Sequence, residues 1–484
     1  MNTATRPAPQ AAFVAPKDLR PQEPAPVSNR GIYGWSRAHL FGSVGQVLLT
    51  LLGILVVYVT IPPLLKFFIF DAVWSGAGRD ACLPEKIGRP VGACWPFIYA
   101  KFNQILYGFY PESERWRVNV VYFLGAALLA PLLFPKVPYK RLNALAFFGV
   151  YPVVCFVLLT GGNLSFNNFL LGGTGLENIA GSFAGLRLSY WVQFIIVTGI
   201  ACGIAALAAP VFGGSRRGAV NGTLSAFGIL ALVLLAMDLD FGLQEVETRQ
   251  WGGLLVTLVI AVTGIVVSLP LGILLALGRR SNLPLVKISS IVFIEFWRGV
   301  PLITVLFFAT YMLPLFLPGR FTIDGLLRAL VGVALFASAY MAEVVRGGLQ
   351  AIPKGQYEGA QAMGLRSGLM MRLVILPQAL KLVIPGIVNN FIGLFKDTTL
   401  VLIVSIFDLL GILRASFTDP SWATPTTLFT GFGFAGLVYF VFCLIPKIRS
   451  SPKSRRPRRP SRWNWSASTN GTAISMCCEI STSP

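Results

Sequence analysis

Residues 253–277 read GLLVTLVIAVTGIVVSLPLGILLAL, a run of 25 residues without a charged side chain. A helix needs about 20 apolar residues to cross the roughly 30 Å hydrocarbon core of a bilayer, so this run is long enough to span a membrane. Nine other apolar runs have a comparable length, and they lie at about 44–70, 118–134, 144–160, 188–212, 219–236, 288–316, 326–345, 384–411 and 426–446. The sequence therefore predicts an all-α polytopic membrane protein with about ten transmembrane helices.

Composition and charge favour the same class. Only 12% of the 484 residues are charged and 55% are apolar, whereas a soluble domain carries about 25% charge. This excludes a disordered chain, a collagen-like fibre and a secreted disulfide scaffold. The net charge is +20, and half of the excess lies in residues 1–40 and 447–484. Because these ends flank the apolar runs, we expect them to face lipid headgroups and set the topology, and we expect no nucleic-acid partner.

Histidine and cysteine usage excludes several kinds of site. His39 is the single histidine, and the seven cysteines contain no C-x-x-C pair. A His-based metal site and a His-based catalytic triad are therefore excluded. The sequence also shows no clustered carboxylates that an integral membrane enzyme would need, so we predict no catalytic residues and no metal site.

The chain divides into four parts. Residues 1–40 are Pro-rich and polar, which predicts a disordered cytoplasmic arm; residues 41–250 form a five-helix N-terminal extension, 251–446 a transmembrane core and 447–484 an atypical basic tail. Lys and Arg are about twice as dense in one alternate set of loops as in the other. The positive-inside rule then places both termini in the cytoplasm and loop 71–117 in the periplasm. In that oxidising compartment Cys82 and Cys94 either pair or remain two thiols.

The inner loop 346–381 is too polar to span a membrane. Tyr357–Met363 reads as a short helix, Gly364 suits a left-handed helix end, and Ser367–Leu376 reads as a second helix limited by Pro377. Two short helices at an angle favour a docking knob for a partner protein. An amphipathic linker on the bilayer surface is the alternative.

This loop resembles a known motif. Glu358-Gly359-Ala360, Gly364, Val374 and Leu376-Pro377 follow the pattern E-A-A-x(3)-G-x(9)-I-x-L-P of the EAA loop in ABC importer membrane subunits, with Gly359 in place of Ala and Val374 in place of Ile. The flanking stretches resemble the polar amino acid branch of these permeases, and they lie at 295–301, 343–348, 355–356, 377–379 and 396–400. The five preceding spans and residues 244–248 are similar to the general L-amino acid permeases.

The resemblance implies a type I ABC importer core in the C-terminal half and a transport function. The chain would be the permease subunit of an ATP-driven importer for L-amino acids in the bacterial inner membrane, without enzymatic activity of its own. An ion-coupled secondary transporter or channel for a small polar solute is the alternative. The residues implied to dock the ATPase are Gln356, Glu358, Gly359, Ala360, Gly364, Leu376 and Pro377.

The resemblance also implies the partners. They are a cytoplasmic ABC ATPase dimer, a paralogous permease subunit and a periplasmic amino acid binding protein, beside the lipid bilayer itself. The sequence agrees in one respect, because it contains no G-x(4)-G-K-[ST] phosphate-binding loop. We therefore expect no directly bound cofactor, with ATP and Mg on the ATPase.

Charged residues inside apolar runs are costly and usually face a cavity, a partner or one another. Glu295 and Arg298 share one helical face, and they either line the translocation path or form a structural ion pair. Glu343 and Arg346 repeat this spacing beside the inner loop. The translocation-path candidates are Glu295, Arg298, Glu343, Lys396 and Asp397, with Asp408 as a further candidate ligand.

The tail departs from the family pattern. Lys453–Arg462 is basic and Pro-rich, and Trp463–Pro484 is rich in Ser and Thr. One hypothesis is a reading-frame change near Leu444. If suitable codons for the residues from Trp463 onward are read one base earlier, the resulting sequence resembles the start of an ABC ATPase. A native basic, disordered tail beside anionic lipid is the alternative.

Overall fold

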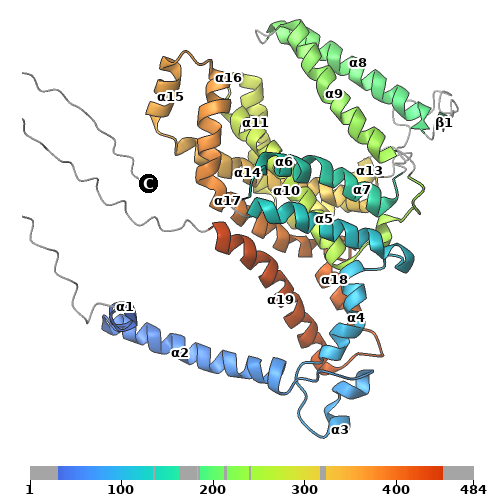
Figure 1. Cartoon of the computed structure of the whole chain (residues 1–484), viewed down its shortest axis with the longest axis vertical. Helices are drawn as coiled ribbons and strands as arrows, with labels where there is room; N and C mark the ends of the chain where they lie inside the picture. Colours follow the sequence, from blue (N-terminus) through green and yellow to red (C-terminus); the bar gives the residue numbers. More distant parts are fainter. Residues whose placement is uncertain are drawn as a thin grey trace, which may run out of the picture. The chain divides into compact units, whose positions relative to one another are not determined.

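The computed structural model describes residues 31–133, 137–162, 182–183, 186–211, 215–238, 241–316 and 323–450. These residues are mostly helical, as predicted, and two-residue strands β1 (Ser182–Phe183) and β2 (Leu186–Arg187) pair antiparallel. Figure 1 shows the helices α1 (Gly31–His39), α2 (Val44–Leu65), α3 (Pro84–Ile87), α4 (Trp95–Tyr107), α5 (Arg115–Leu133), α6 (Lys140–Leu145), α7 (Tyr151–Thr160), α8 (Leu188–Val211), α9 (Arg216–Asp238), α10 (Gly253–Arg279), α11 (Pro284–Gly299), α12 (Leu302–Phe307), α13 (Leu313–Phe316), α14 (Gly325–Gln350), α15 (Lys354–Ala362), α16 (Ser367–Met370), α17 (Leu376–Asp397), α18 (Leu409–Ser416) and α19 (Pro425–Ser450).

Shorter helical turns join or extend these helices. The π-helical turns are η2 (Lys66–Phe70), η5 (Ala146–Val150), η8 (Phe308–Met312) and η9 (Met371–Ile375). The 3-10 turns are η3 (Arg79–Cys82), η4 (Glu112–Glu114), η7 (Thr248–Gln250) and η10 (Thr398–Val404).

Seven helical segments in the described ranges are long and apolar enough to cross a membrane. They are Val44–Phe70, Leu142–Thr160, Arg216–Met237, Gly253–Arg279, Gly325–Gln350, Ser367–Val404 and Pro425–Leu444. The pair Pro284–Gly299 and Leu302–Phe316 gives an eighth if it is one span bent by 100°. The chain is therefore polytopic, although fewer segments qualify than the predicted ten. Two predicted runs do not qualify within the described residues: α5 begins with polar residues, and α8 qualifies over Trp191–Leu207 as a shorter apolar helix.

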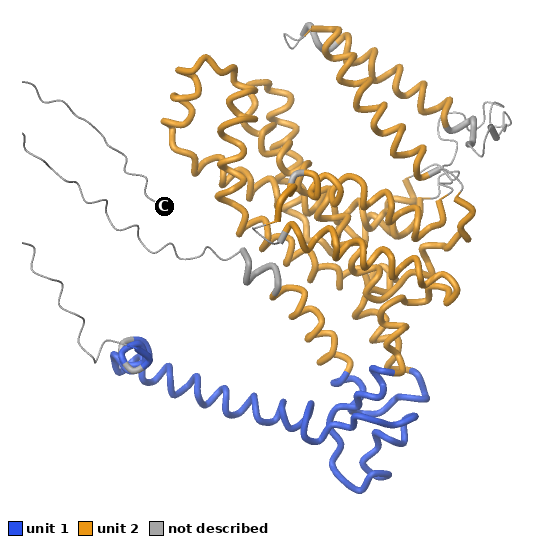
Figure 2. Tube along the Cα trace, viewed as in Figure 1, with its two compact units in different colours: residues 1–99, 419–430 blue, residues 100–418, 431–484 orange. Residues whose placement is uncertain are grey.

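The chain forms two compact units, 1–99 with 419–430 and 100–418 with 431–484 (Figure 2). In the first unit, α2 is followed by an irregular segment in which Cys82 and Cys94 form a disulfide. Of the two states that the sequence left open, a disulfide or two thiols, the structure thus has the disulfide.

The second unit is organised around α14, which packs against α10, α11, α12 and α17. One apolar cluster joins α5 and α7 of the extension to the first halves of α10 and α14. A second cluster joins the last halves of α10 and α14 to α15 and α17. Small residues let these helices approach closely: a Cβ on Gly272 would lie 2.7 Å from the Met341 side chain, and one on Gly348 would lie 2.8 Å from the Ala379 carbonyl oxygen.

Three boundaries around the inner loop differ from the sequence predictions. The first loop helix, predicted as Tyr357–Met363, is α15 and spans Lys354–Ala362. Pro377 does not end the second loop helix, because Ser367–Val404 is one helical segment. Pro377 occupies the first turn of α17, where its missing N–H costs little, and the π turn η9 precedes it. The predicted span 384–411 instead ends at Val404, because Ser405 turns into the left-handed region with φ +62°.

The predicted terminal segments also change at their inner ends. Residues 31–39 of the predicted disordered arm form α1, and residues 447–450 of the predicted tail continue α19. The remainder of both segments, and therefore both hypotheses about the tail, lie outside the described residues.

Candidate functional site

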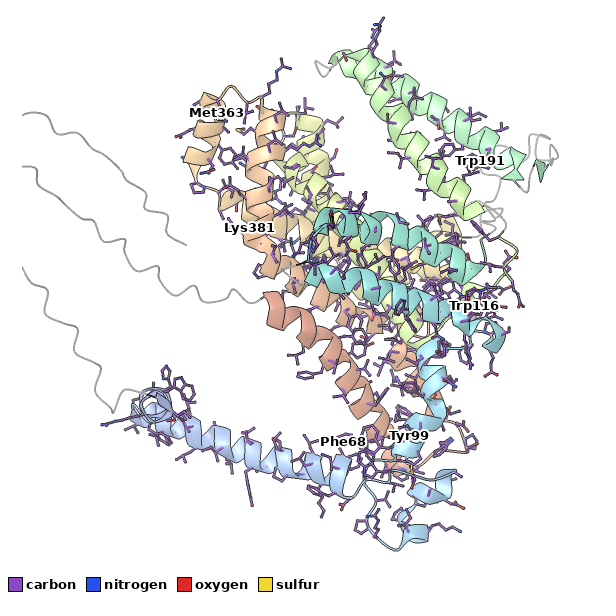
Figure 3. The ribbon with its side chains drawn as sticks, in the orientation of Figure 1. Phe68, Tyr99, Trp116, Trp191, Met363 and Lys381 are labelled. Carbon is purple, nitrogen blue, oxygen red and sulfur yellow. A yellow bond between two sulfur atoms is a disulfide. The ribbon has the colours of Figure 1, made fainter. Side chains whose placement is uncertain are left out.

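The predicted docking loop forms an exposed elbow made of α15 and the start of α16 (Figure 1). Gly364 ends the elbow's first helix in the left-handed region, with φ +73°, as the sequence predicted. Met363 is 76% exposed at the turn (Figure 3). The predicted docking residues that are exposed are Gln356, Glu358, Gly359, Gly364 and Pro377.

The other two predicted docking residues serve the fold. Ala360 is buried, and it packs in the apolar cluster beneath α15 with half-buried Leu376 close by. A larger side chain at Ala360 would push α15 away from this cluster, and thus from α16 and η9. The exposed face of α15 is thus free for a partner, while its buried face fixes the elbow to the helices below.

Polar contacts reinforce this attachment. Arg280, just after α10, donates through Nη1 to the Tyr357 hydroxyl at 3.1 Å and to the Leu349 carbonyl at 3.3 Å. Its guanidinium also lies over the Tyr357 ring, 5.7 Å from the centroid. Gln378 donates to Gln356 at 3.0 Å. The elbow is therefore bonded to α10, α14 and α17. Sequence reasoning missed Arg280 and Tyr357, since residues 77 positions apart carry no local signal.

The two ion pairs that the sequence predicted belong to one network. Glu343 contacts Arg346 at 2.7 Å and Arg279 at 3.0 Å, and Arg279 also reaches Glu295 at 2.9 Å. Arg298 is more distant, 3.9 Å from Glu295 and 3.8 Å from Glu343. The network links the ends of α10, α11 and α14. Arg279 is its centre, and sequence reasoning did not find it because Arg279 belongs to neither predicted pair.

A cavity of about 210 Å³ opens between α14 and α17. Its lining includes Asp397 and Asn390 among otherwise apolar or aromatic side chains, with Tyr340 on the facing helix. Arg298 lies over the Tyr340 ring, 5.8 Å from its centroid, so the cavity adjoins the ion network. Lys396 is exposed and does not line the cavity. A carboxylate, an amide and an aromatic ring together suit a small polar or cationic solute.

Asp408 has a structural position. It caps α18, accepting from the Gly411 amide at 2.9 Å, and Tyr439 donates to its other oxygen at 3.2 Å. Its side chain is fully buried, and burial raises the pKa of its carboxyl, with the Gly411 hydrogen bond acting in the opposite direction. Its placement therefore supports a helix cap more than the ligand role considered from the sequence.

The described residues offer no obvious metal centre. Within the described ranges, no three His, Cys, Asp or Glu side chains gather closely enough to hold a metal ion. What the arrangement provides is an exposed elbow, an ion network and a mainly apolar cavity with a carboxylate and an amide in its lining, on α10, α11, α14, α15, α16 and α17.

Comparison with known proteins places this arrangement among transport proteins. Residues 268–448 match the family model of the binding-protein-dependent transport system inner membrane component. The chain is 41% identical over 423 residues to the inner membrane amino-acid ABC transporter permease protein YhdY of Escherichia coli, covering 87% of this chain and 92% of the relative. It is also 41% identical over 437 residues to the glutamate/glutamine/aspartate/asparagine transport system permease protein BztC of Rhodobacter capsulatus, covering 89% and 94%.

Proposed function

Because this chain belongs to the family of binding-protein-dependent transport system inner membrane components, we propose that it is the permease subunit of an ATP-driven importer for L-amino acids. Its identity to amino-acid permeases along nearly their whole length is the observation that carries this proposal. The chain moves solute from the periplasm to the cytoplasm by alternating access, in which helices rock about a central site.

The elbow around α15 is the proposed ATPase-docking site. Glu358 and Gly359 are exposed on it, and a Cβ on Gly359 would meet nothing within 4 Å, so a groove on a partner has room to approach. The ATP and Mg belong to a separate ATPase dimer. Motion of the elbow passes to α10, α14 and α17 through Arg280, Leu349 and Gln378.

The cavity beside Asp397 is the proposed part of the translocation path. It lies between α14 and α17, the helices that enter and leave the elbow. Movement of the elbow would thus change the cavity's shape directly. Glu295, Arg298 and Glu343 act beside this path as an ion network that holds three helix ends together.

Both termini are proposed to lie in the cytoplasm of a bacterium, with the chain crossing its inner membrane. The Cys82–Cys94 disulfide supports this orientation, because disulfides persist in the periplasm and are rare in the cytosol. On the periplasmic face, an amino acid binding protein delivers the substrate. A paralogous permease subunit is the proposed second half of the channel.

Charge reversal at the elbow tests the proposal. Glu358→Lys should prevent copurification of the ATPase and abolish ATP-driven uptake of labelled L-glutamate, L-glutamine, L-aspartate or L-asparagine, while the subunit still inserts into the membrane. Glu112→Lys is the matched control, since Glu112 is also an exposed helical glutamate but lies on η4 in the predicted periplasmic loop. Normal ATPase association and uptake in Glu358→Lys would refute the docking site. Uptake driven by an ion gradient without any ATPase would favour the secondary transporter.

A further inference from the structure

Residues 419–430 comprise the end of the loop between α18 and α19 and the first six residues of α19, and they fold together with a segment from the distant N-terminal extension. Cys94 and Thr430, which bond to each other, are separated by 336 positions. The family match at 268–448 includes residues 419–430 but not the N-terminal segment. We name residues 71–97 the disulfide element. Both segments lie in the first of the two compact units (Figure 2).

The disulfide element has a shape fixed by its own bonds. The Cys82–Cys94 disulfide closes it, and Val73 forms an isolated β-bridge with Cys94, donating to the Ala93 carbonyl at 2.9 Å and accepting from the Trp95 amide at 3.0 Å. The backbone also approaches η2 so closely that a Cβ on Gly92 would lie 2.2 Å from the Phe67 carbonyl oxygen. Only glycine fits there.

This element contacts residues 419–430 at two backbone positions and one ring pair. The Cys94 amide donates to the Thr430 hydroxyl at 2.9 Å, and the Arg79 amide donates to the Ser421 carbonyl at 3.0 Å. The Phe97 and Trp422 rings lie 6.5 Å apart. Cys94 and Thr430 are both fully buried, so the first of these bonds is shielded from water and its loss would leave an unsatisfied buried amide.

The loop part of the held segment, before α19 begins, has short-range bonds around Trp422. Trp422 and Ala423 donate to the Asp419 carbonyl, and the Thr427 hydroxyl donates to the Trp422 carbonyl at 2.8 Å. Such a turn is a weak restraint by itself, because a few local bonds must offset the entropy of ordering the chain. Contacts from outside the segment, such as the Cys94–Thr430 bond, therefore add to what fixes its position.

We propose that the disulfide element is a clamp that holds residues 419–430 and fixes where α19 begins, so that the N-terminal extension completes the outer end of the permease core. The clamp depends on the disulfide, since Cys94 supplies both the covalent closure and the amide that reaches Thr430. Transport requires the clamp, because α19 is the last helix of the core and continues from Thr430 past Tyr439, which bonds to Asp408.

Hydrogen exchange of the full-length protein in lipid nanodiscs tests the clamp. Exchange is compared for peptides covering 419–430 in the wild type, in Cys82→Ala/Cys94→Ala and in Thr430→Val, which keeps the disulfide but lacks the hydroxyl. We expect exchange there to be at least about tenfold faster in both variants, with peptides of α10 and α14 unchanged. The control is Cys155→Ala/Cys202→Ala, which removes two half-buried thiols elsewhere.

Uptake by cells expressing the complete transport system is measured with the same variants and the same four labelled amino acids. We expect the initial rate to fall at least about fivefold in both clamp variants and to be unchanged in the control. Unchanged exchange at 419–430 would overturn the clamp, even if uptake fell. Normal uptake despite the faster exchange would overturn it as well, since the start of α19 would then be free without consequence.

Discussion

Removing the Arg280 guanidinium should weaken the link between the elbow and α10. Arg280→Gln removes a cationic donor that lies 3.1 Å from the Tyr357 hydroxyl and 3.3 Å from the Leu349 carbonyl. A hydrogen bond to a charged group contributes about 1.5 kcal/mol or more, and a cation over an exposed ring about 0.5 kcal/mol. Because Arg280 is exposed, solvent screening reduces this sum to about 1 kcal/mol. This corresponds to about a fivefold decrease in the equilibrium constant that favours the linked state.

The quantity to measure is the amount of amino acid imported per ATP hydrolysed in proteoliposomes containing the purified complex. We expect this ratio to fall about fivefold in Arg280→Gln and by less in Tyr357→Phe, which keeps the ring, while the ATPase remains associated with both variants. Lys287→Gln is the control, because Lys287 is exposed on α11 and its change removes the same charge.

A double-mutant cycle sharpens the test. Since the two side chains contact each other, the effect of Arg280→Gln/Tyr357→Phe should be smaller than the sum of the two single effects, although the double variant also loses the Tyr357–Leu349 hydrogen bond of 3.3 Å. The reasoning is refuted if the import ratio of Arg280→Gln equals that of the wild type, or if the two single effects simply add.

Two further predictions concern the ion network and the cavity. Glu343→Gln should lower the melting temperature of the detergent-solubilised subunit more than Glu295→Gln does, because the Glu343 side chain is 16% exposed and that of Glu295 is 53% exposed. The expected losses of unfolding free energy are about 2 kcal/mol for Glu343→Gln and under about 1 kcal/mol for Glu295→Gln. Equal shifts of the melting temperature would contradict this ranking. Asp397→Asn should raise the KM for uptake about tenfold, because it removes the carboxylate charge from the cavity. Lys381→Gln, on the exposed side of α17, is the control. An unchanged KM in Asp397→Asn would show that the cavity is not part of the translocation path.

Local patterns predicted the elements well. The apolar runs predicted the helices. Gly364 predicted the end of α15, because glycine readily adopts the left-handed conformation in which a helix commonly ends. The spacing of Glu343 and Arg346 predicted their ion pair, since residues three apart share a helical face. Each of these signals lies within a few residues of its consequence.

Contacts between distant segments could not be predicted in this way. Arg279 joins Glu343 across 64 positions, and the disulfide element meets Thr430 across 336; both depend on tertiary packing that no local period encodes. The prediction that Pro377 limits the second loop helix was wrong for a different reason. A proline usually limits a helix, but the π turn η9 precedes it and places it in the first turn of α17.

The partnership between Cys94 and Thr430 has a consequence for biosynthesis. A ribosome adds about 5 to 20 residues per second, so the 336 positions between them correspond to roughly 20 to 70 seconds of translation. During that interval the disulfide element has been synthesised while residues 419–430 have not. Any chaperone or thiol oxidase that binds the nascent chain must therefore act on a disulfide element whose contact surface for residues 419–430 is still uncovered, until α19 has been synthesised.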